Sequence, residues 1–249
     1  MRHLILSDIH ANVTALDAAL AAAKGKWDKA VCLGDVVGYG PDPNEVIDRI
    51  RELGAITIRG NHDKAGSGLA NAEDFNPVAR NAALWTREQL RPELREYLEK
   101  LPTGPATVDG FTIVHGAQRD EDEYVFAPAQ ALDGLIEAAT PVTFFGHTHL
   151  QGGFTLRNDA DKVGVLHFKP EGENKFTPLT IEAGTTYLLN PGSIGQPRDG
   201  DTRAAFAIAD LDNKVVEFWR VLYDIEAVQK RMAAANLPEP LILRLKFGR

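Results

Sequence analysis

The sequence predicts an α/β fold in which helices pack on the faces of a sheet of parallel strands. Short apolar runs alternate with helical patterns through the first third of the chain, and a short polar motif follows each of these runs. Such alternation is typical of βαβ units, whose helices cover a parallel sheet. With 249 residues, of which 44% are hydrophobic and 25% charged, the chain is long enough to bury a substantial core.

Three strands and two helices are expected in this first third. The apolar runs at 4–6, 30–33 and 56–58 are short, which favours buried strands. Between them, apolar residues recur every three or four positions around 13–20 and 46–53, which is the period of a helix that covers a sheet.

The middle of the chain predicts an inserted helical segment. Residues 64–76 are rich in Gly, Ala, Asn and Asp and are expected to form a loop, whereas 77–100 predicts two helices separated near Pro92. We therefore expect a helical insertion at about 64–105, which lies over one end of the sheet within a single domain of residues 1–249.

Strands are expected to return after the insertion. The apolar runs at 111–114 and 142–145 predict two strands, with a helix at about 128–138 between them. The remainder is expected to be mostly strand from residue 151, ending in a helix at about 225–235 that the following prolines stop.

Composition and charge exclude some classes of function. A formal net charge of -8 argues against a protein that binds nucleic acid through a basic surface, and a bound metal could supply the local positive charge that an anionic substrate needs. Cys32 is the only cysteine, so no disulfide can form within the chain. The run at 4–6 is too short for a signal-peptide core and no later segment could cross a membrane, so a cytoplasmic location is expected. The oligomeric state stays open.

Five short polar motifs come directly after predicted strands. In chain order they are Ser7-Asp8-Ile9-His10, Gly34-Asp35, Gly60-Asn61-His62-Asp63, His115-Gly116 and Gly146-His147-Thr148-His149. Because ligands bind at the carboxyl ends of strands in open α/β sheets, these motifs are expected to converge on one site. A single histidine in such a place is most often structural, so it is the ordered set that indicates a function.

The residue types of the motifs indicate a metal site. Asp, His and Asn without thiolate suit Mn, Fe, Zn, Co or Ni better than Cu(I), and better than the all-oxygen sites of Mg or Ca. Asp8 and His10 are two positions apart, as are His147 and His149. On an extended segment, both side chains of such a pair would point the same way.

The ordered motifs resemble those of the calcineurin-like metallophosphoesterases, and the turn at 190–193 resembles the bacterial branch of small phosphodiesterases and nucleotide phosphatases. The resemblance implies a four-layer sandwich of two mixed β-sheets flanked by helices. It implies two divalent or trivalent transition-metal ions, with Mn as the expected metal and Fe, Zn, Co or Ni as alternatives. One ion would be bound by Asp8, His10, Asp35 and His149, and the other by Asp35, Asn61, His115 and His147.

The implied activity is hydrolysis of phosphate esters or anhydrides by metal-bound hydroxide. The substrates would be small phosphorylated molecules, nucleotide-like ones among them, and His62 would contact the phosphate and protonate the leaving oxygen. One alternative is a phosphomonoesterase, including a phosphoprotein phosphatase. Another is a non-catalytic binding module on the same fold, as in a retromer subunit that lacks the catalytic histidine. His62 and the full ligand set favour the enzyme.

One departure from the family concerns substrate contacts. The serine/threonine protein phosphatases of this superfamily carry an Asp and an Arg shortly after the bridging Asp, where this chain has Gly38 and Tyr39. A dedicated protein phosphatase is therefore disfavoured. The candidates to contact substrate instead are Asn12, Tyr39, Arg119 and Arg198.

Overall fold

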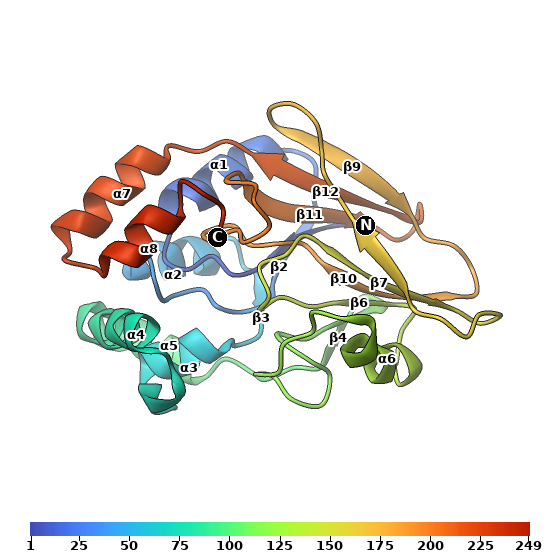
Figure 1. Ribbon diagram of the computed structural model, residues 1–249, viewed down its shortest axis with the longest axis horizontal. Helices are drawn as coiled ribbons and strands as arrows, with labels where there is room; N and C mark the ends of the chain where they lie inside the picture. Colours follow the sequence, from blue (N-terminus) through green and yellow to red (C-terminus); the bar gives the residue numbers. More distant parts are fainter.

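Two six-stranded mixed sheets lie face to face in the computed structural model, which describes residues 1–249 (Figure 1). This arrangement, with helices outside both sheets, confirms the α/β fold class. The single parallel sheet that the apolar runs suggested is in fact part of one mixed sheet, because later strands join its edge in the antiparallel direction. None of the helices combines the length and apolar composition needed to cross a bilayer.

The first sheet contains the three parallel strands expected from the start of the chain and three strands from its end. Its order is β3 (Ile56–Thr57), β2 (Lys29–Cys32), β1 (Arg2–Leu6), β11 (Ala204–Asp210), β12 (Val215–Val221) and β9 (Lys175–Thr180). The strand β1 pairs in parallel with β2, and β11 pairs antiparallel with β1 on its other side.

The second sheet is formed by the middle of the chain. Its order is β4 (Ala106–Val108), β5 (Phe111–Ile113), β6 (Val142–Phe144), β10 (Thr185–Asn190), β7 (Gly152–Arg157) and β8 (Gly164–His167). The three central strands β5, β6 and β10 are parallel to one another.

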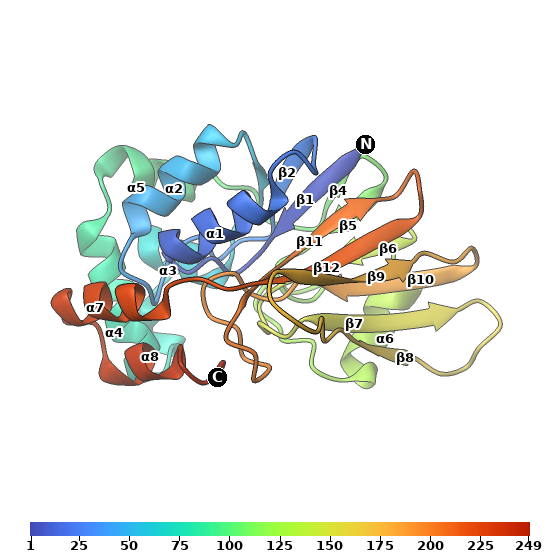
Figure 2. The same ribbon diagram turned by 90° about the horizontal axis from the view of Figure 1, so that it is seen from above.

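Helices cover the outer faces of both sheets. The first sheet is covered by α1 (Val13–Ala23) and α2 (Pro43–Glu52), and the second by α6 (Pro128–Ile136). The residues between β3 and β4 form α3 (Asn61–Ser67), η1 (Ala72–Asp74), α4 (Pro77–Gln89) and α5 (Pro92–Glu99). The chain ends in α7 (Ile225–Ala234) and α8 (Glu239–Arg244). In both views the helices of the insertion and of the chain end gather at the end of the molecule toward which β1 runs (Figure 2); they are α3, α4, α5, α7 and α8.

Alternating side chains give β1 two apolar faces. Leu4 and Leu6 pack against α1 and α2, whereas Ile5 packs between the sheets with Phe111 and Phe144. All five side chains are fully buried. Because both faces of β1 are covered, residues 4–6 are all apolar, and the polar motif begins directly after the strand at Ser7.

Three local features differ from the prediction or add to it. Residues 64–76 are not one loop, since α3 begins at Asn61 within the Gly-Asn-His-Asp motif and continues to Ser67, and η1 spans Ala72–Asp74. The strand β4 was not foreseen. The prolines after α7 end that helix as expected, but Pro240 also lies in the first turn of α8, where its missing N–H costs nothing.

Candidate metal centre

The five motifs converge between the carboxyl ends of strands from both sheets. Asp8 follows β1, and Asp35 lies just beyond β2. His115 and His147 follow β5 and β6 of the other sheet. The site thus lies where the two sheets meet the helical end of the molecule, as the strand-end argument predicted.

The side chains form two buried groups that share Asp35. In each group, the potential ligand atoms all lie within 4.8 Å of one another. The first group is Asp8, His10, Asp35 and His149, and the second is Asp35, His115 and His147. The Asp35 Oδ2 lies 3.6 Å from His10 Nε2 and 3.5 Å from His115 Nε2, so one carboxylate oxygen faces both groups.

Backbone carbonyls fix the orientation of the imidazoles. The Nδ1 atoms of His10, His115 and His149 lie 3.1, 2.8 and 2.6 Å from the carbonyl oxygens of Val37, Leu33 and Gln196. A carbonyl oxygen only accepts, so each Nδ1 carries a hydrogen and each Nε2 is the ring nitrogen left to face the cluster, with a lone pair wherever the ring is neutral. This is the arrangement that proteins use to orient metal-binding histidines.

Several buried atoms of the cluster have no hydrogen-bonding partner of their own. His115 Nε2 and Asn61 Oδ1 are buried without one. His10 Nε2 and His149 Nε2 face each other at 3.0 Å, although both are acceptors in the tautomers just derived. Buried lone pairs in such positions are costly unless a cation lies against them. The donor set therefore fits metal ions, and Asn61, which lines the same cavity as His147, offers a neutral oxygen.

Burial and charge set the protonation of the cluster. Burial lowers the pKa of His10 and His149 well below the usual value, and lowers that of His147 to about 3, so these rings are neutral as metal ligands must be. Burial would also lower the pKa of His115, but the charge of Asp35 raises it to about 10, so this ring would release its Nε2 proton on binding a metal. Burial raises the pKa of Asp8 to about 7, against the opposing charge of His115.

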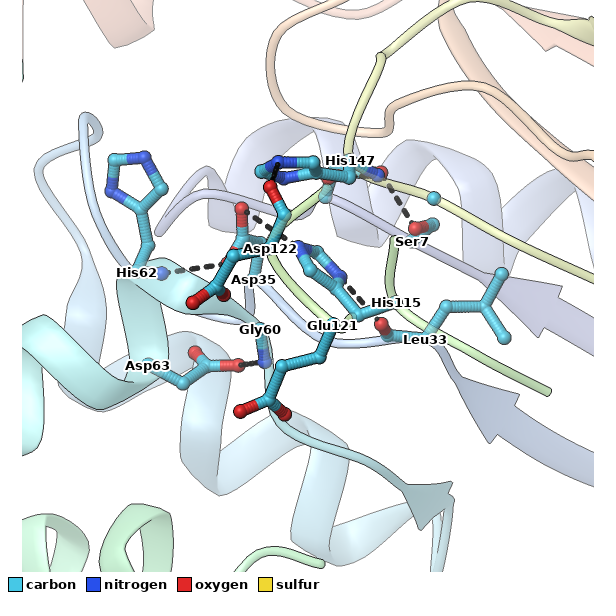
Figure 3. A network of polar contacts seen from close by, with 12 residues as sticks. Ser7, Leu33, Asp35, Gly60, His62, Asp63, His115, Glu121, Asp122 and His147 are labelled. Carbon is cyan, nitrogen blue, oxygen red and sulfur yellow. Dashed lines mark hydrogen bonds and ion pairs between the residues drawn. The ribbon is translucent and has the colours of Figure 1, made fainter. Parts of the chain in front are cut away.

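His62 belongs to neither group. Its backbone N–H donates to Asp35 Oδ1 at 2.9 Å, while its ring points away from Asp35 and His115 (Figure 3). The ring lies among the rings of Tyr39, Phe75 and His10, with centroid distances of 4.3, 4.7 and 5.0 Å. Its Nδ1 is buried without a partner. Burial lowers the pKa of His62 to about 4, against the charge of Asp35.

Supporting contacts hold the motifs in place. Asp63 accepts from the N–H groups of Gly60 and Val37 at 2.9 and 3.1 Å, so it caps α3 and does not orient the His62 ring. The Asn190 side chain donates to the Gly146 carbonyl and the Thr148 hydroxyl at 2.9 and 3.0 Å. The turn at 190–193 therefore braces the Gly-His-Thr-His loop.

The four candidate substrate contacts lie in different surroundings. Tyr39 packs on the His10 and His62 rings, and the Arg198 guanidinium carbon lies 5.6 Å from the Tyr39 ring centroid. Asn12 is buried and uses its side chain to cap α1 and to bond the Gly195 carbonyl. Arg119 lies on an exposed surface, where it pairs with Asp133 of α6 and with Glu137 directly after that helix. The structure thus brings Tyr39 and Arg198 to the cluster, but not Arg119.

A cavity of about 310 Å³ opens beside His147 of the second group, and the insertion forms one of its walls. His62, His147 and Phe75 line it together with Tyr124, a residue that the sequence patterns did not single out. The Tyr124 ring stacks on His147 at a centroid distance of 3.8 Å. It follows the acidic run at 120–123, in which the Asp122 carboxylate accepts from Lys64 of α3 and the Asp122 carbonyl oxygen lies 3.0 Å from His147 Nε2.

A buried cluster of Asp, His and Asn at the strand ends of a two-sheet α/β fold has the build of a metal-dependent hydrolase. Residues 1–214 match the calcineurin-like phosphoesterase superfamily domain. The chain therefore belongs to the calcineurin-like phosphoesterase superfamily.

Three other proteins are similar to this chain over nearly all of its length. An uncharacterized protein of Methanocaldococcus jannaschii is 32% identical, with 98% of this chain and 97% of that protein covered. A metallophosphoesterase from Sphaerobacter thermophilus is 41% identical, with a TM-score of 0.83 and with 100% of this chain and 99% of that chain covered. A hypothetical protein from Pyrococcus horikoshii shares the fold at 22% identity and a TM-score of 0.77, over 100% and 98% of the two chains.

Proposed function

We propose that this protein is a phosphohydrolase that uses two transition-metal ions to cleave phosphate esters or anhydrides of small substrates, nucleotide-like ones among them. The observation that carries the proposal is the pair of buried donor groups joined by Asp35. The cavity of about 310 Å³ beside His147 and Asn61 supports a small substrate, because pockets for small molecules begin near this size.

The first ion would be held by Asp8, His10, Asp35 and His149, and the second by Asp35, Asn61, His115 and His147. Such ions lower the pKa of a bound water and offset the negative charge on phosphoryl oxygens. We infer Mn as the preferred metal, with Fe, Zn, Co or Ni as alternatives, because imidazole nitrogens form a large share of the donors.

The chain itself contributes orientation and a proton donor. The backbone carbonyls behind His10, His115 and His149 hold the rings in one tautomer, so the donor atoms are aimed before substrate arrives. His62 lines the cavity beside the second group, where its imidazole can donate a hydrogen bond or a proton to the leaving oxygen. A neighbouring phosphate dianion would raise the pKa of His62 from its low value in the free protein.

Metal depletion and restoration test this function. The protein is treated with chelator, dialysed and assayed on bis(4-nitrophenyl) phosphate after adding single metals. We expect no activity without metal, and higher activity with Mn than with Mg. Full activity in the metal-free protein, or activity restored by Mg but not by Mn, Co, Ni, Zn or Fe, would contradict the proposal.

A further inference from the structure

Two arginines beside the cluster share one neutral acceptor. The Oε1 atom of the buried Gln196 accepts from Arg198 Nη2 at 2.8 Å and from Arg244 Nη1 at 3.0 Å. Neither guanidinium pairs with a carboxylate, since the nearby Asp199 and Asp201 are engaged by other arginines. Two cations thus stand side by side with only an amide oxygen between them.

This pairing leaves positive charge uncompensated. Like charges in contact repel each other, and a neutral amide oxygen does not offset two of them. Accordingly, burial and the charge of Arg198 lower the pKa of Arg244. A local surplus of positive charge is notable in a chain with a formal net charge of -8, and it suits an anion.

The arginine pair is tied to the first donor group. The Gln196 backbone carbonyl accepts from His149 Nδ1 at 2.6 Å, and the Arg198 N–H donates to the His149 carbonyl at 3.2 Å. The Arg198 guanidinium also lies over Tyr39, whose ring lines the cavity that holds His62. An anion at the arginines would therefore be a neighbour of a phosphoryl group at the cluster.

Arg244 comes from outside the region that defines the family. It ends α8, beyond the residues 1–214 that match the family domain. The C-terminal segment is hydrogen-bonded to the loop that carries Arg198, since the Gly200 N–H donates to the Gly248 carbonyl at 3.0 Å. The terminal helix therefore adds a cation to a site that the common fold already contains.

We propose that Arg198 and Arg244 form an anion subsite that binds a second phosphoryl group, adjacent to the one held at the metal centre. The proposal rests on the proposed function and names its substrate class, which is small molecules with at least two linked phosphoryl groups. Planar guanidinium groups match phosphate oxygens with paired hydrogen bonds. Hydrolysis of such an anhydride breaks one P–O bond and forms another from the water oxygen. The leaving phosphate oxygen takes a proton, and the arginines offset the charge that remains.

Calorimetry on the metal-loaded protein tests the subsite without requiring turnover. Methylenediphosphonate carries two phosphoryl groups on a bridge that is not hydrolysed, and inorganic phosphate carries one. In Arg198→Ala and Arg244→Ala, the Kd for methylenediphosphonate should rise roughly 10- to 100-fold, as expected for lost hydrogen bonds between charged groups. The Kd for inorganic phosphate and the metal content should stay near wild type. Arg157→Ala, which removes an exposed arginine paired with Asp159 on β7, is the control and should change neither Kd.

Three results would overturn the subsite: equal weakening of both ligands, no weakening of either, or the same selective loss in Arg157→Ala. If Arg244→Ala fails to fold by circular dichroism, Arg244→Gln keeps most of the packing and is held to the same expectation. The two proposals fail separately. A selective loss in a protein that hydrolyses no phosphate compound keeps the subsite and refutes the phosphohydrolase. Hydrolysis of aryl phosphodiesters without a selective loss of methylenediphosphonate binding keeps the phosphohydrolase and refutes the subsite.

Discussion

Replacing His62 by alanine separates proton donation from metal binding. The His62 ring lies in neither donor group, and the hydrogen bond from residue 62 to Asp35 comes from the backbone, so alanine retains it. The variant should therefore bind metal as the wild type does. Only the imidazole that lines the cavity is lost.

The expected loss of rate is roughly 10²- to 10⁴-fold, which is the usual contribution of a general acid. At about 1.36 kcal/mol per tenfold change, this is about 3–5 kcal/mol of transition-state stabilisation. The effect on folding should be smaller. The contacts of the ring with Tyr39 and Phe75 are lost, but a buried Nδ1 without a partner is removed with them. These two effects oppose each other, so the free energy of unfolding should change by less than about 2 kcal/mol.

The assay compares leaving groups at measured metal content. A nitrophenolate leaves with little need of a proton, so its release should fall less than that of an alkyl alcohol or a nucleoside. Equal losses for both would show that His62 binds phosphate without donating a proton. Loss of a metal would make His62 a ligand, and unchanged rates on all substrates would remove it from the mechanism.

Three further changes test the arrangement. Asp35→Asn should reduce both metal content and rate more than any other single ligand change, because Asp35 faces both donor groups; elemental analysis showing two metals with near-normal turnover would refute the bridge. A Cβ at Gly38 would lie 2.5 Å from His62 Nδ1, so Gly38→Ala should lower the rate at constant metal content. Gly110→Ala, with a similar positive φ but no atom near its Cβ, should not, and equal losses would place the effect in the backbone. Burial opposes ionisation of Glu121, but hydrogen bonds from Arg59 and Lys64 lower its pKa to about 2. The ion pairs of Glu121 therefore stabilise the fold above about pH 4.5, and this stabilisation is lost as the pH falls toward 2. The gap in unfolding free energy between wild type and Glu121→Gln, up to about 1 kcal/mol, should shrink over that range; a gap independent of pH would contradict the reasoning.

The sequence predicted the elements whose residues carry a regular apolar pattern. The strand β1 and the helix α2 are of this kind, because packing against a layer imposes a period that is visible in the residues. The helix α3 was not predicted because its buried residues are mainly polar or small, so they show no apolar period; the Asp63 carboxylate caps its first turn. The strand β4 was missed because it is only three residues long and half-exposed.

The same limit applies to the site. The ordered motifs predicted seven ligand candidates in one cluster because each stands near the end of a strand, and six of them lie in the two donor groups. Arg198 and Arg119 were indistinguishable as single loop arginines, and only the fold shows that one faces the cluster while the other pairs with Asp133 of α6. The residues around Arg244 in the sequence do not single it out, because its role depends on the Gln196 oxygen that it shares with Arg198, 46 positions away.

The spacing of the ligand pairs pointed to the right residues, but the extended conformation assumed for them was incorrect. The pairs Asp8/His10 and His147/His149 were expected to point together on extended segments, but all four residues have positive φ, between 48° and 66°. Such conformations cost side-chain-bearing residues about 1–3 kcal/mol each and persist only where surrounding structure imposes them. Here the loops after β1 and β2 impose them on each other, through the Asp8 N–H to the Gly34 carbonyl and the His10 N–H to the Asp35 carbonyl at 3.1 and 3.0 Å. The ligand positions are therefore set by paired loops rather than by either motif alone, so the protein can hold its donors in place before a metal binds.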